Sequence, residues 1–516
     1  MKILTAQQMA YIDKTTIEGG TPGIELMRNA GMEVYKLIDD TLNIRSGIVV
    51  LAGKGNNGGD GFRVAELMAN QGYDITVCLV GEKTMVQGDA ATCMHDLEKT
   101  GQKIIEINGH DKLEALSKEI TSANLIIDAL FGTGLKGEIT GLPASVIDKV
   151  NSSKSTVVAV DIPSGVNAST GEVSNSTIQA DYTVTFGCLK VGHVFMPGRK
   201  KCGITNITDI GFSDEIINSI EPFGHSLAST EAAVLLPKRP YNAHKGSTGK
   251  VFVLSGSVGM TGAATLASKA AMRVGAGVVT IGCPVSLNDI LEAKCTEAMT
   301  LPLPEVRKKR CLSLRALGMV RDVTQLVDVV AVGPGLGIYC ETKELVRRFI
   351  SQYKGKIVLD ADGINSFKGN IDELKNAPGE IIVTPHYGEL SKLMGLTVKE
   401  IAGDPIKASG EAAKLTGKII LLKGTPTIIS SPQGISWING TGNQGMATAG
   451  MGDVLTGVIT GFAAQGVDIF DAAVLGAYVH GLAGDFAAEE QGIPGMVSGD
   501  VLELLPQALI TISESS

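Results

Sequence analysis

The sequence predicts an α/β protein with two domains, each built on a mainly parallel β-sheet covered by helices. Apolar runs of four or five residues recur along the chain, and they end on Gly, Asp, His or Lys. Such runs are typical of buried parallel strands, whose carboxyl ends converge on one crevice. The 64 glycines lie in clusters between the runs, which indicates many tight strand-to-helix turns. A chain of 516 residues is long enough for at least two such domains.

The composition argues against a protein that binds nucleic acid or an anionic membrane. Its 45 basic and 54 acidic residues give a formal charge of −9, and there is one Trp and no basic block. The eight cysteines form no C-x-x-C pair, so we expect reduced, mostly buried thiols. The seven histidines show no metal-ligand spacing. The N-terminus lacks the apolar core of a signal peptide, and no apolar run approaches about 18 residues, so a soluble, cytoplasmic protein is expected.

The first half begins with two helices, followed by a strand, a Gly-rich loop and a third helix. A Thr cap predicts a helix over 5–18, and Pro22 is expected at the first helical position of the next. The apolar run 48–52 predicts a buried strand, the loop 53–61 follows it, and the third helix is expected from Phe62. Because this order binds dinucleotide phosphates, we predict a Rossmann-like three-layer αβα sandwich.

The loop 53–61 does not have the G-x-G-x-x-G pattern of a plain pyrophosphate loop. Its Asn56, Asn57 and Asp60 add side-chain oxygens, which suit a hard cation or ribose hydroxyls. Alternatively, Asn and Gly provide the left-handed backbone angles of a tight turn.

Two more strands are predicted in this half, at 125–130 and 157–161, and each ends on polar residues and glycines. Because the carboxyl ends of parallel strands meet at one edge of a sheet, side chains from all three strand ends should be neighbours. These side chains are Asn57, Asp128, Lys136, Asp161 and Ser164.

A polar segment near 220–228 is the expected linker, which divides the chain into domains 1–222 and 228–516. Beyond it, five apolar runs predict strands of a second, mainly parallel sheet with a site along one edge. The runs are 251–254, 329–332, 357–360, 381–384 and 419–422.

A Gly-rich stretch near the C-terminus, 442–457, runs into an apolar helix. Such a loop leaves unpaired backbone N–H groups that can hold phosphate oxygens at the helix N-terminus. Asp453 places a carboxylate there, and a carboxylate beside an anion hole suits phosphoryl transfer to a hydroxyl group. Alternatively, Asp453 only caps the helix.

The segments GKGNNGGDG, DALFGTGLKGE and DIPSG resemble the NAD(P)H-hydrate epimerase domain over about residues 1 to 222. The resemblance implies a potassium ion held by Asn57, Asp128 and Ser164, and Lys136 and Asp161 as the acid/base pair. Alternatively, Asp161 only orders its turn and Lys136 only holds phosphate. The implied substrate site comprises Asn56, Asn57, Gly58, Gly59, Asp60, Gly132, Thr133, Gly134, Leu135, Lys136, Gly137, Glu138 and Asp161.

Six later motifs, HKGSTGK, GPGLG, LDADG, TPHYGE, KGTPT and GMATAGMGDVLTG, resemble ADP/ATP-dependent NAD(P)H-hydrate dehydratases, whose fold is ribokinase-like. The similarity spans about residues 228 to 510. It implies Mg²⁺, ADP or ATP as co-substrate, and contacts of the hydrated dinucleotide with Ala263, Gly337, His386 and Asp453, although His386 could equally be a turn histidine. The nucleotide donor is implied to contact Lys423, Gly424, Thr425, Pro426, Thr427 and Gly452.

Together, the two resemblances imply a bifunctional repair enzyme that acts on the hydrates NADHX and NADPHX. The first half would interconvert the R and S epimers, and the second would dehydrate the S form, with ADP favoured over ATP. The resemblance also implies a homo-oligomer. The alternative is a ribokinase-type small-molecule kinase with a non-catalytic dinucleotide-binding module at its N-terminus.

Overall fold

The computed structural model describes residues 1–135 and 137–515, and the chain divides into two compact units. The first unit is Met1–His225 and the second is Ser226–Ser516. The division falls within the polar segment 220–228, of which residues 224–225 form a short strand.

The first unit contains a seven-stranded sheet, in the order β4-β3-β2-β5-β6-β7-β9, in which every neighbouring pair is parallel. The three strands predicted in this half are confirmed, each to within one residue. The strands are β2 (Ile48–Ala52), β3 (Ile75–Val80), β4 (Ile104–Ile107), β5 (Leu125–Ala129), β6 (Thr156–Val160), β7 (Tyr182–Phe186) and β9 (Ile204–Thr208).

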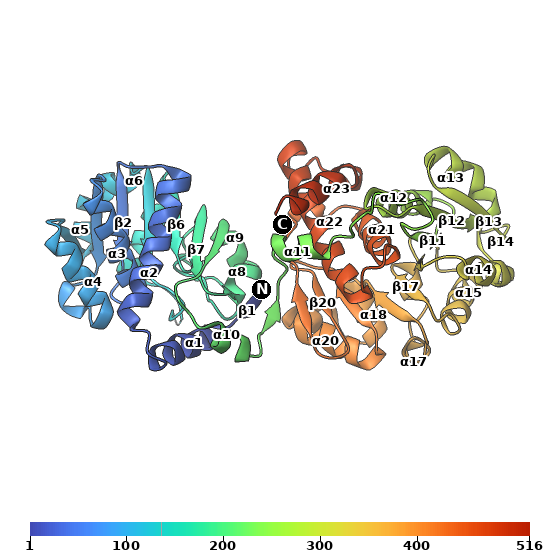
Figure 1. Ribbon diagram of the computed structural model, residues 1–516, viewed down its shortest axis with the longest axis horizontal. Coiled ribbons are helices and arrows are strands. Elements are labelled where there is room, and N and C mark those ends of the chain that lie inside the picture. Colours follow the sequence, from blue (N-terminus) through green and yellow to red (C-terminus); the bar gives the residue numbers. More distant parts are fainter. Residues whose placement is uncertain (136, 516) are drawn as a thin grey trace. The chain divides into compact units, whose positions relative to one another are not determined.

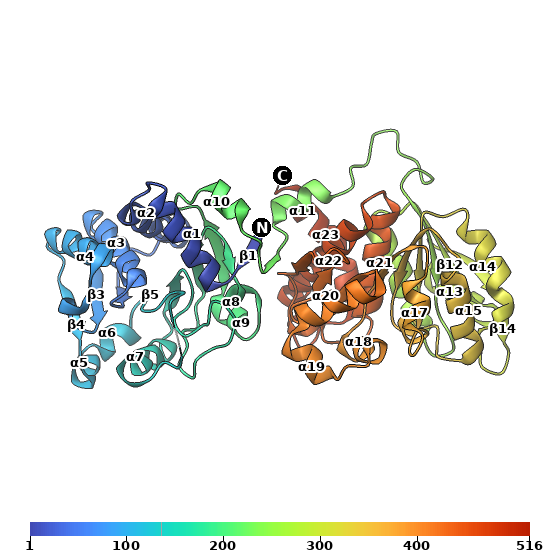
Figure 2. The ribbon, with the colours of Figure 1, turned by 90° about the horizontal axis from the view of Figure 1, so that it is seen from below.

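Helices cover both faces of this sheet, as the predicted three-layer architecture requires (Figure 2). Alternate residues of a strand point to opposite faces, so Val50 packs with α1 to α4, and Leu51 packs with α5 to α7. These helices are α1 (Ala6–Glu18), α2 (Gly23–Lys36), α3 (Asn56–Asn70), α4 (Gly88–Lys99), α5 (His110–Ala115), α6 (Ser117–Thr121) and α7 (Gly141–Asn151).

Short elements complete the first unit. Strand β1 pairs in parallel with β8 and antiparallel with β10. Their bounds, with those of the remaining helices, are β1 (Lys2–Leu4), β8 (Leu189–Lys190), β10 (Gly224–His225), α8 (Val191–Val194), α9 (Gly198–Cys202) and α10 (Asp214–Ser219).

The first helix begins as predicted, because Thr5 and Gln8 form a reciprocal capping box at the start of α1. The prediction for α2 was wrong by one position. Pro22 is the N-cap residue of α2, and Gly23 is the first helical residue.

Helix α3 begins at Asn56, six residues before the predicted start at Phe62. The reason is close packing: a Cβ on Gly59 would lie 2.5 Å from Met27 Sδ, and one on Gly61 would lie 2.6 Å from Ala129 Cβ. The glycines therefore belong to a helix that lies tightly against the sheet, and they do not form an extended loop.

The second unit contains a sheet with the order β13-β12-β11-β16-β17-β18-β19-β20-β21. The first seven strands are parallel, and β20 and β21 continue the sheet antiparallel. The five predicted strands are confirmed to within one residue. The strands are β11 (Lys250–Leu254), β12 (Val278–Pro284), β13 (Met299–Leu303), β16 (Val329–Val332), β17 (Lys356–Leu359), β18 (Glu380–Val383), β19 (Ile419–Leu422), β20 (Ile428–Ser430) and β21 (Ser436–Ile438). A separate antiparallel pair consists of β14 (Glu305–Val306) and β15 (Cys311–Leu312).

Two helical layers also cover the second sheet (Figure 1). Val253 packs with α12 and α21 to α23 on one face, and Phe252 packs with α14 to α20 on the other. The helices of the unit are α11 (Ser229–Leu235), α12 (Thr261–Arg273), α13 (Asn288–Lys294), α14 (Leu317–Thr324), α15 (Cys340–Ile350), α16 (Asp362–Asn365), α17 (Ile371–Lys375), α18 (Tyr387–Met394), α19 (Val398–Gly403), α20 (Pro405–Thr416), α21 (Met451–Ala464), α22 (Ile469–Gln491) and α23 (Ser498–Ser513).

The eight cysteines are free, and all except Cys340 are buried, which confirms the prediction of reduced, mostly buried thiols. None of the described helices combines the length and the apolar composition that crossing a bilayer requires.

We predict that Gly58→Ala destabilises the first unit by about 1–3 kcal/mol. The new Cβ would overlap the carbonyl oxygen of Gly53, and this clash outweighs the gain in helix propensity of about 1 kcal/mol. Urea unfolding followed by circular dichroism measures the change. Gly55→Ala is the matched control, because a Cβ there meets nothing within 4 Å; equal stabilities of the two variants would contradict the packing argument.

Candidate functional site

A cavity of about 690 Å³ opens in the first unit, where the carboxyl ends of β2, β5 and β6 meet α1 and α2. It confirms that the strand ends converge, as expected for a parallel sheet. Its lining includes eight of the substrate-site residues expected from the sequence: Asn56, Asn57, Asp60, Gly132, Thr133, Gly134, Leu135 and Asp161.

The other expected substrate-site residues lie elsewhere or outside the described part of the chain. Gly58 and Gly59 pack inside the unit, against Gly53 and Met27. The Glu138 carboxylate accepts hydrogen bonds from Ser174 Oγ at 2.8 Å and from the Asn175 amide at 3.0 Å. Gly137 has a left-handed backbone with φ of 77°. Lys136 lies outside the described residues.

Asp161 adopts a left-handed backbone conformation, with φ of 65°, at the carboxyl end of β6. This conformation is uncommon for a residue other than Gly, and surrounding contacts must hold it. The Asp161 N–H donates to Val184 O at 2.7 Å. His193 Nδ1 accepts the Lys190 N–H at 3.0 Å, so its Nε2 carries the proton and donates to Asp161 O at 3.0 Å. These contacts fix the direction of the Asp161 side chain.

The carboxylate of Asp161 forms an ion pair with the buried Lys190, which is 1% exposed. Lys190 Nζ donates to Asp161 Oδ1 at 2.6 Å, to Thr185 Oγ1 at 2.7 Å and to Phe186 O at 3.0 Å, so all three of its protons are bonded. Thr185 Oγ1 also donates to Asp161 Oδ1. Among the described residues, these side-chain bonds all reach Oδ1, and none reaches Oδ2.

The charges around this cavity set the protonation of its acids. Burial alone would raise the pKa of Asp161, but the charge and hydrogen bond of Lys190 hold it below the ordinary value. Burial, followed by the charges of Asp161 and Asp13, raises the pKa of Asp60 well above its ordinary value. Burial lowers the pKa of His193 to about 4, so this ring is neutral.

The three residues expected to hold a potassium ion lie beside the same cavity. The buried carboxylate of Asp128 accepts hydrogen bonds from Ser164 Oγ at 2.6 Å and from the Ser164 amide at 2.8 Å. Ser164 Oγ also accepts a hydrogen bond from the Phe131 amide at 2.9 Å. The next residue, Gly132, lies beside Asn57, because a Cβ on Gly132 would be 3.3 Å from Asn57 Oδ1. Asn57 Nδ2 is buried without a partner among the described atoms. The atoms of these three side chains that could bind a cation are all oxygens, and such a set suits a hard monovalent cation.

Sequence reasoning missed a further acid of this cavity, Asp13, which comes from helix α1. It lies outside the strand ends, and the only sequence signal is the helical spacing of Met9, Asp13 and Ile17, all of which line the cavity.

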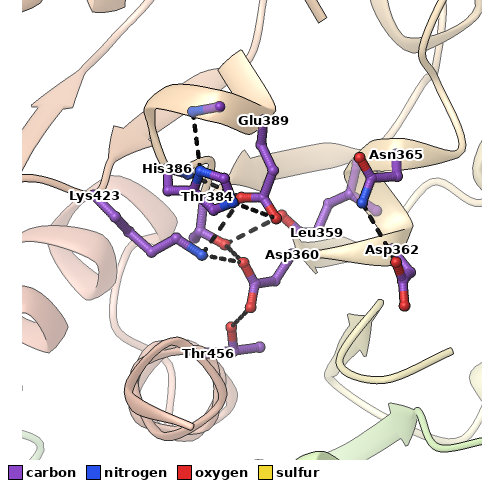
Figure 3. Close-up of polar contacts among 10 residues, drawn as sticks. Leu359, Asp360, Asp362, Asn365, Thr384, His386, Glu389, Lys423 and Thr456 are labelled. Atoms are coloured by element: carbon purple, nitrogen blue, oxygen red, sulfur yellow. Dashed lines mark hydrogen bonds and ion pairs between the residues drawn. The ribbon is translucent and has the colours of Figure 1, made fainter. Parts of the chain in front are cut away.

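In the second unit, the Asp360 carboxylate connects three elements at the carboxyl ends of the strands (Figure 3). Asp360 follows β17, and its side chain is 2% exposed. Its Oδ1 accepts hydrogen bonds from Lys423 Nζ at 2.7 Å and from Thr384 Oγ1 at 2.8 Å. Its Oδ2 accepts from Thr456 Oγ1 of α21 at 3.0 Å.

Lys423 follows β19 and points inward to two carboxylates, at 2.7 Å from Asp360 and 3.7 Å from Glu389 (Figure 3). Burial alone would lower the pKa of Lys423, but these carboxylates raise it above the ordinary value. Glu389 Oε2 also accepts the His386 N–H at 2.9 Å, and His386 Nδ1 accepts the Gly388 N–H at 2.9 Å. His386 therefore caps α18, and its Nε2 lies 3.5 Å from Glu389 Oε1.

Asp453 is in the first turn of α21, and Gly450 precedes the helix as an N-cap without a side-chain hydrogen bond. The first backbone N–H groups of this helix have no acceptor within it, which leaves them free to hold anionic oxygens. A Cβ on Gly452 would lie 3.2 Å from Lys423 Nζ and 3.7 Å from Asp360 Oδ2, so the first turn of α21 approaches the ion pair closely. Burial, followed by the Asp360 charge, raises the pKa of Asp453 to about 7.

The other residues that the sequence predicts for this site are Gly337, Ala263 and the segment 424–427. The Gly337 amide donates to Asp362 Oδ2 at 2.8 Å, and the Asp362 charge helps to raise the pKa of Asp453. Ala263 is in the first turn of α12, where a Cβ on Gly335 would lie 3.1 Å from it. Gly424 and Thr425 are exposed, Thr427 is half-buried and Pro426 is buried.

In comparisons with known proteins, two different family models match the two parts of the chain. Residues 23–192 match the family model described as YjeF-related protein N-terminus, and residues 251–507 match the model described as NAD(P)H-hydrate dehydratase. The chain is 40% identical to the bifunctional NAD(P)H-hydrate repair enzyme Nnr of Moorella thermoacetica, over 100% of this chain and 98% of that protein. It is 31% identical to Nnr of Escherichia coli, over 93% and 88% of the two chains. An ADP/ATP-dependent NAD(P)H-hydrate dehydratase from Bacillus subtilis, solved with ATP and Mg²⁺, is 26% identical with a TM-score of 0.49, over 56% of this chain and 99% of that one.

We predict that Asp453→Asn stabilises the second unit above pH 7, by about 1–3 kcal/mol, and has little effect near pH 4. Because folding raises the pKa of this carboxyl to about 7, the folded protein binds the proton more tightly than the unfolded chain does. Stability is therefore lost as the pH rises from about 4 to about 7, and the amide removes this loss. Urea unfolding at several pH values, followed by fluorescence of the single Trp437, measures it. The exposed control variant Glu411→Gln keeps Asp453 and should lose stability over this pH range as the wild type does.

Proposed function

Because this chain belongs to the family of bifunctional NAD(P)H-hydrate repair enzymes, we propose that its two units perform successive steps on hydrated NADH and NADPH. The first unit interconverts the R and S epimers, and the second dehydrates the S epimer with a nucleotide. Similarity over the full length supports this activity over the ribokinase-type kinase with a non-catalytic N-terminal module. The observation that carries the proposal is that each unit places an aspartate at a lysine–aspartate ion pair. Asp161 bonds Lys190 in the first unit, and Asp453, at the start of α21, adjoins the Lys423–Asp360 pair in the second.

Epimerisation requires the ring hydroxyl to leave and water to add from the other face. Loss of the hydroxyl gives an iminium ion stabilised by the ring nitrogen, so one group must donate a proton and another must accept one. Asp161 is the proposed acceptor, since Lys190 keeps its carboxylate ionised and Oδ2 accepts no bond from the described residues. Lys136 is the second residue that the resemblance implies for this step.

Asn57, Asp128 and Ser164 are the proposed ligands of a potassium ion beside the epimerase cavity. The oxygens that support this fit are Asp128 Oδ1 and Ser164 Oγ, which lie 2.6 Å apart, and Asn57 Oδ1, which lies 3.3 Å from a Cβ on Gly132. The cation would anchor the loops after β2, β5 and β6 and would balance the buried Asp128 charge. Asn56, Asp60 and the segment 132–135 then contact the substrate.

Dehydration in the second unit begins when the Asp453 carboxylate accepts the proton of the ring hydroxyl. The oxygen attacks the terminal phosphoryl group and displaces the rest of the nucleotide, while the amides at the start of α21 hold the phosphoryl oxygens. Phosphate then leaves with the C–O electron pair, and the neighbouring carbon loses a proton to water, which restores the dihydronicotinamide. A pKa of about 7 makes Asp453 a stronger base than an ordinary carboxylate and leaves much of it ionised near neutral pH.

The remaining site residues are proposed as binding groups. Ala263, Gly337 and His386 contact the hydrated dinucleotide, and the segment 423–427 with Gly452 contacts the nucleotide, for which we propose ADP over ATP. Mg²⁺ would neutralise the phosphate charge of the nucleotide. Among residues 1–135 and 137–515, no cluster of three or more His, Cys, Asp or Glu side chains could hold a metal ion, which supports entry of Mg²⁺ with the phosphates.

We further propose a homo-oligomer in the cytoplasm. The eight free cysteines support a reducing compartment.

We predict that Asp453→Asn abolishes nucleotide-driven dehydration, with a loss of about 10²–10⁴-fold, and leaves epimerisation unchanged. The reason is that the amide cannot accept the hydroxyl proton, whereas the epimerase cavity lies in the other unit. Absorbance of the reduced nicotinamide ring follows dehydration, and chromatographic separation of the epimers follows the first step. Equal loss of both activities would exclude two separate sites.

We predict that Asp161→Asn lowers the epimerisation rate about 10²–10⁴-fold, with dehydration of the S epimer unchanged. The variant loses the proton acceptor and also leaves Lys190 without its counter-ion, which destabilises the first unit. The double variant Asp161→Asn/Lys190→Met restores the charge balance and should regain stability but no epimerase activity. A normal epimerisation rate in a folded Asp161→Asn protein would eliminate Asp161 as the acceptor.

A further inference from the structure

Helix α1 turns one face to the epimerase cavity, and Asp13 is the only ionisable side chain on that face. Met9, Asp13 and Ile17 are spaced by four residues and line the cavity, and Ala10 lines it beside them. The neighbouring face of the helix, with Ile12 and Thr16, is buried against the unit. Asp13 therefore lines the cavity from α1 and is exposed to solvent.

Asp13 lies outside the region that the family models match, which begins at residue 23 in this unit. The charged groups that face it across the cavity are the carboxyls of Asp60 and Asp161 and the ammonium of Lys190. Lys54 and Asp89 also line the cavity. Asp13 is exposed on the cavity wall, where partial desolvation, followed by the Asp161 charge, raises its pKa to about 6, and Lys190 partly offsets this rise.

The surroundings of Asp13 therefore favour its protonated form more than the surroundings of Asp161 do. Lys190 bonds directly to Asp161 and keeps it ionised, whereas Asp13 has no such bond in the described contacts and faces the Asp161 charge. Two acids in one cavity whose surroundings favour opposite protonation states can serve as donor and acceptor of the same reaction.

We propose that Asp13 is a catalytic residue of the first unit, which donates the proton to the leaving ring hydroxyl while Asp161 accepts a proton from the incoming water. This inference rests on the proposed epimerase function and identifies its donor.

The step is balanced in atoms and charge. The Asp13 carboxylic acid protonates the hydroxyl, the C–O bond breaks, water leaves, and the ring nitrogen lone pair stabilises the cation. Water then forms a C–O bond on the opposite face and gives its proton to the Asp161 carboxylate. Exchange with solvent through the cavity returns the proton to Asp13, and the opposite direction follows the same steps in reverse.

A carboxylic acid suits the donor role better than an unperturbed ammonium group does. A lysine with an ordinary pKa of about 10.4 is roughly four powers of ten weaker as an acid than a group with a pKa of about 6. Efficient general acids have a pKa near the working pH. Lys136 would then hold the phosphates of the dinucleotide, which is the alternative that its sequence context leaves open.

The test compares the pH dependence of epimerisation in Asp13→Asn and in the wild type, starting from one pure epimer without nucleotide. In the wild type, kcat should fall about tenfold per pH unit above about pH 6, because Asp13 must carry a proton. Asp13→Asn should lower kcat about 10²–10⁴-fold at pH 6, abolish this fall and change KM little. Asp13→Glu should restore part of the rate together with the pH dependence.

Two further variants give the controls. Glu18→Gln makes the same carboxyl-to-amide change on α1 at an exposed ion pair with Lys14, and it should keep the wild-type rate and profile. Lys136→Met should keep the fall above pH 6 and raise KM. The inference would be overturned if Asp13→Asn kept the wild-type rate and pH profile. It would also be overturned if Lys136→Met lost the fall of kcat above pH 6 while Asp13→Asn kept it. Absence of epimerisation in the wild type would instead refute the epimerase function itself.

Discussion

Each unit of this protein depends on a lysine, buried in the first unit and half-buried in the second, that holds an aspartate at the carboxyl end of a parallel sheet. In the first unit, Lys190 binds Asp161 at 2.6 Å, and in the second, Lys423 binds Asp360 at 2.7 Å. A buried ion pair adds little net stability compared with apolar packing, whereas removal of one partner costs about 3–5 kcal/mol. The pairs are therefore better explained by what they do to neighbouring acids than by what they add to the fold.

The two pairs have opposite effects on the proposed bases. Asp161 is itself a member of its pair, so the lysine lowers its pKa and keeps it ionised. Asp453 stands next to its pair, and the Asp360 charge raises its pKa by more than Lys423 lowers it. Thr456, one turn along the same helix, bonds Asp360 and fixes α21 against the pair. A lysine–aspartate ion pair thus keeps Asp161 ionised in one site and makes Asp453 a stronger base in the other.

Apolar runs and capping residues are local signals, so eight strands and the start of α1 could be predicted from the sequence. Other strands, such as β3, β4, β7 and β9, were not predicted. The start of α3 could not be predicted, since Gly58 to Gly61 are explained by contacts with Met27 and Ala129 from other elements. The motifs contain Asp161, Asp360 and Asp453. The bonds of Lys190 to Asp161 and of Lys423 to Asp360 join residues 29 and 63 positions apart, so no local pattern reveals them. Asp13 carries no motif, and only the packing of α1 brings it to the cavity.

The electrostatics of the two sites also match the energetics of the two proposed reactions. Epimerisation interconverts two similar diastereomers and consumes no co-substrate, so its donor and acceptor must both be regenerated at little cost. Two carboxyls that face each other within reach of solvent meet this requirement, because each lowers the other's tendency to ionise. Dehydration is driven by phosphoryl transfer and runs in one direction, so it needs one base strong enough to activate an alcohol. Burial beside a paired carboxylate provides that base, which explains why Asp453 lacks a lysine bond of its own while Asp360 has one.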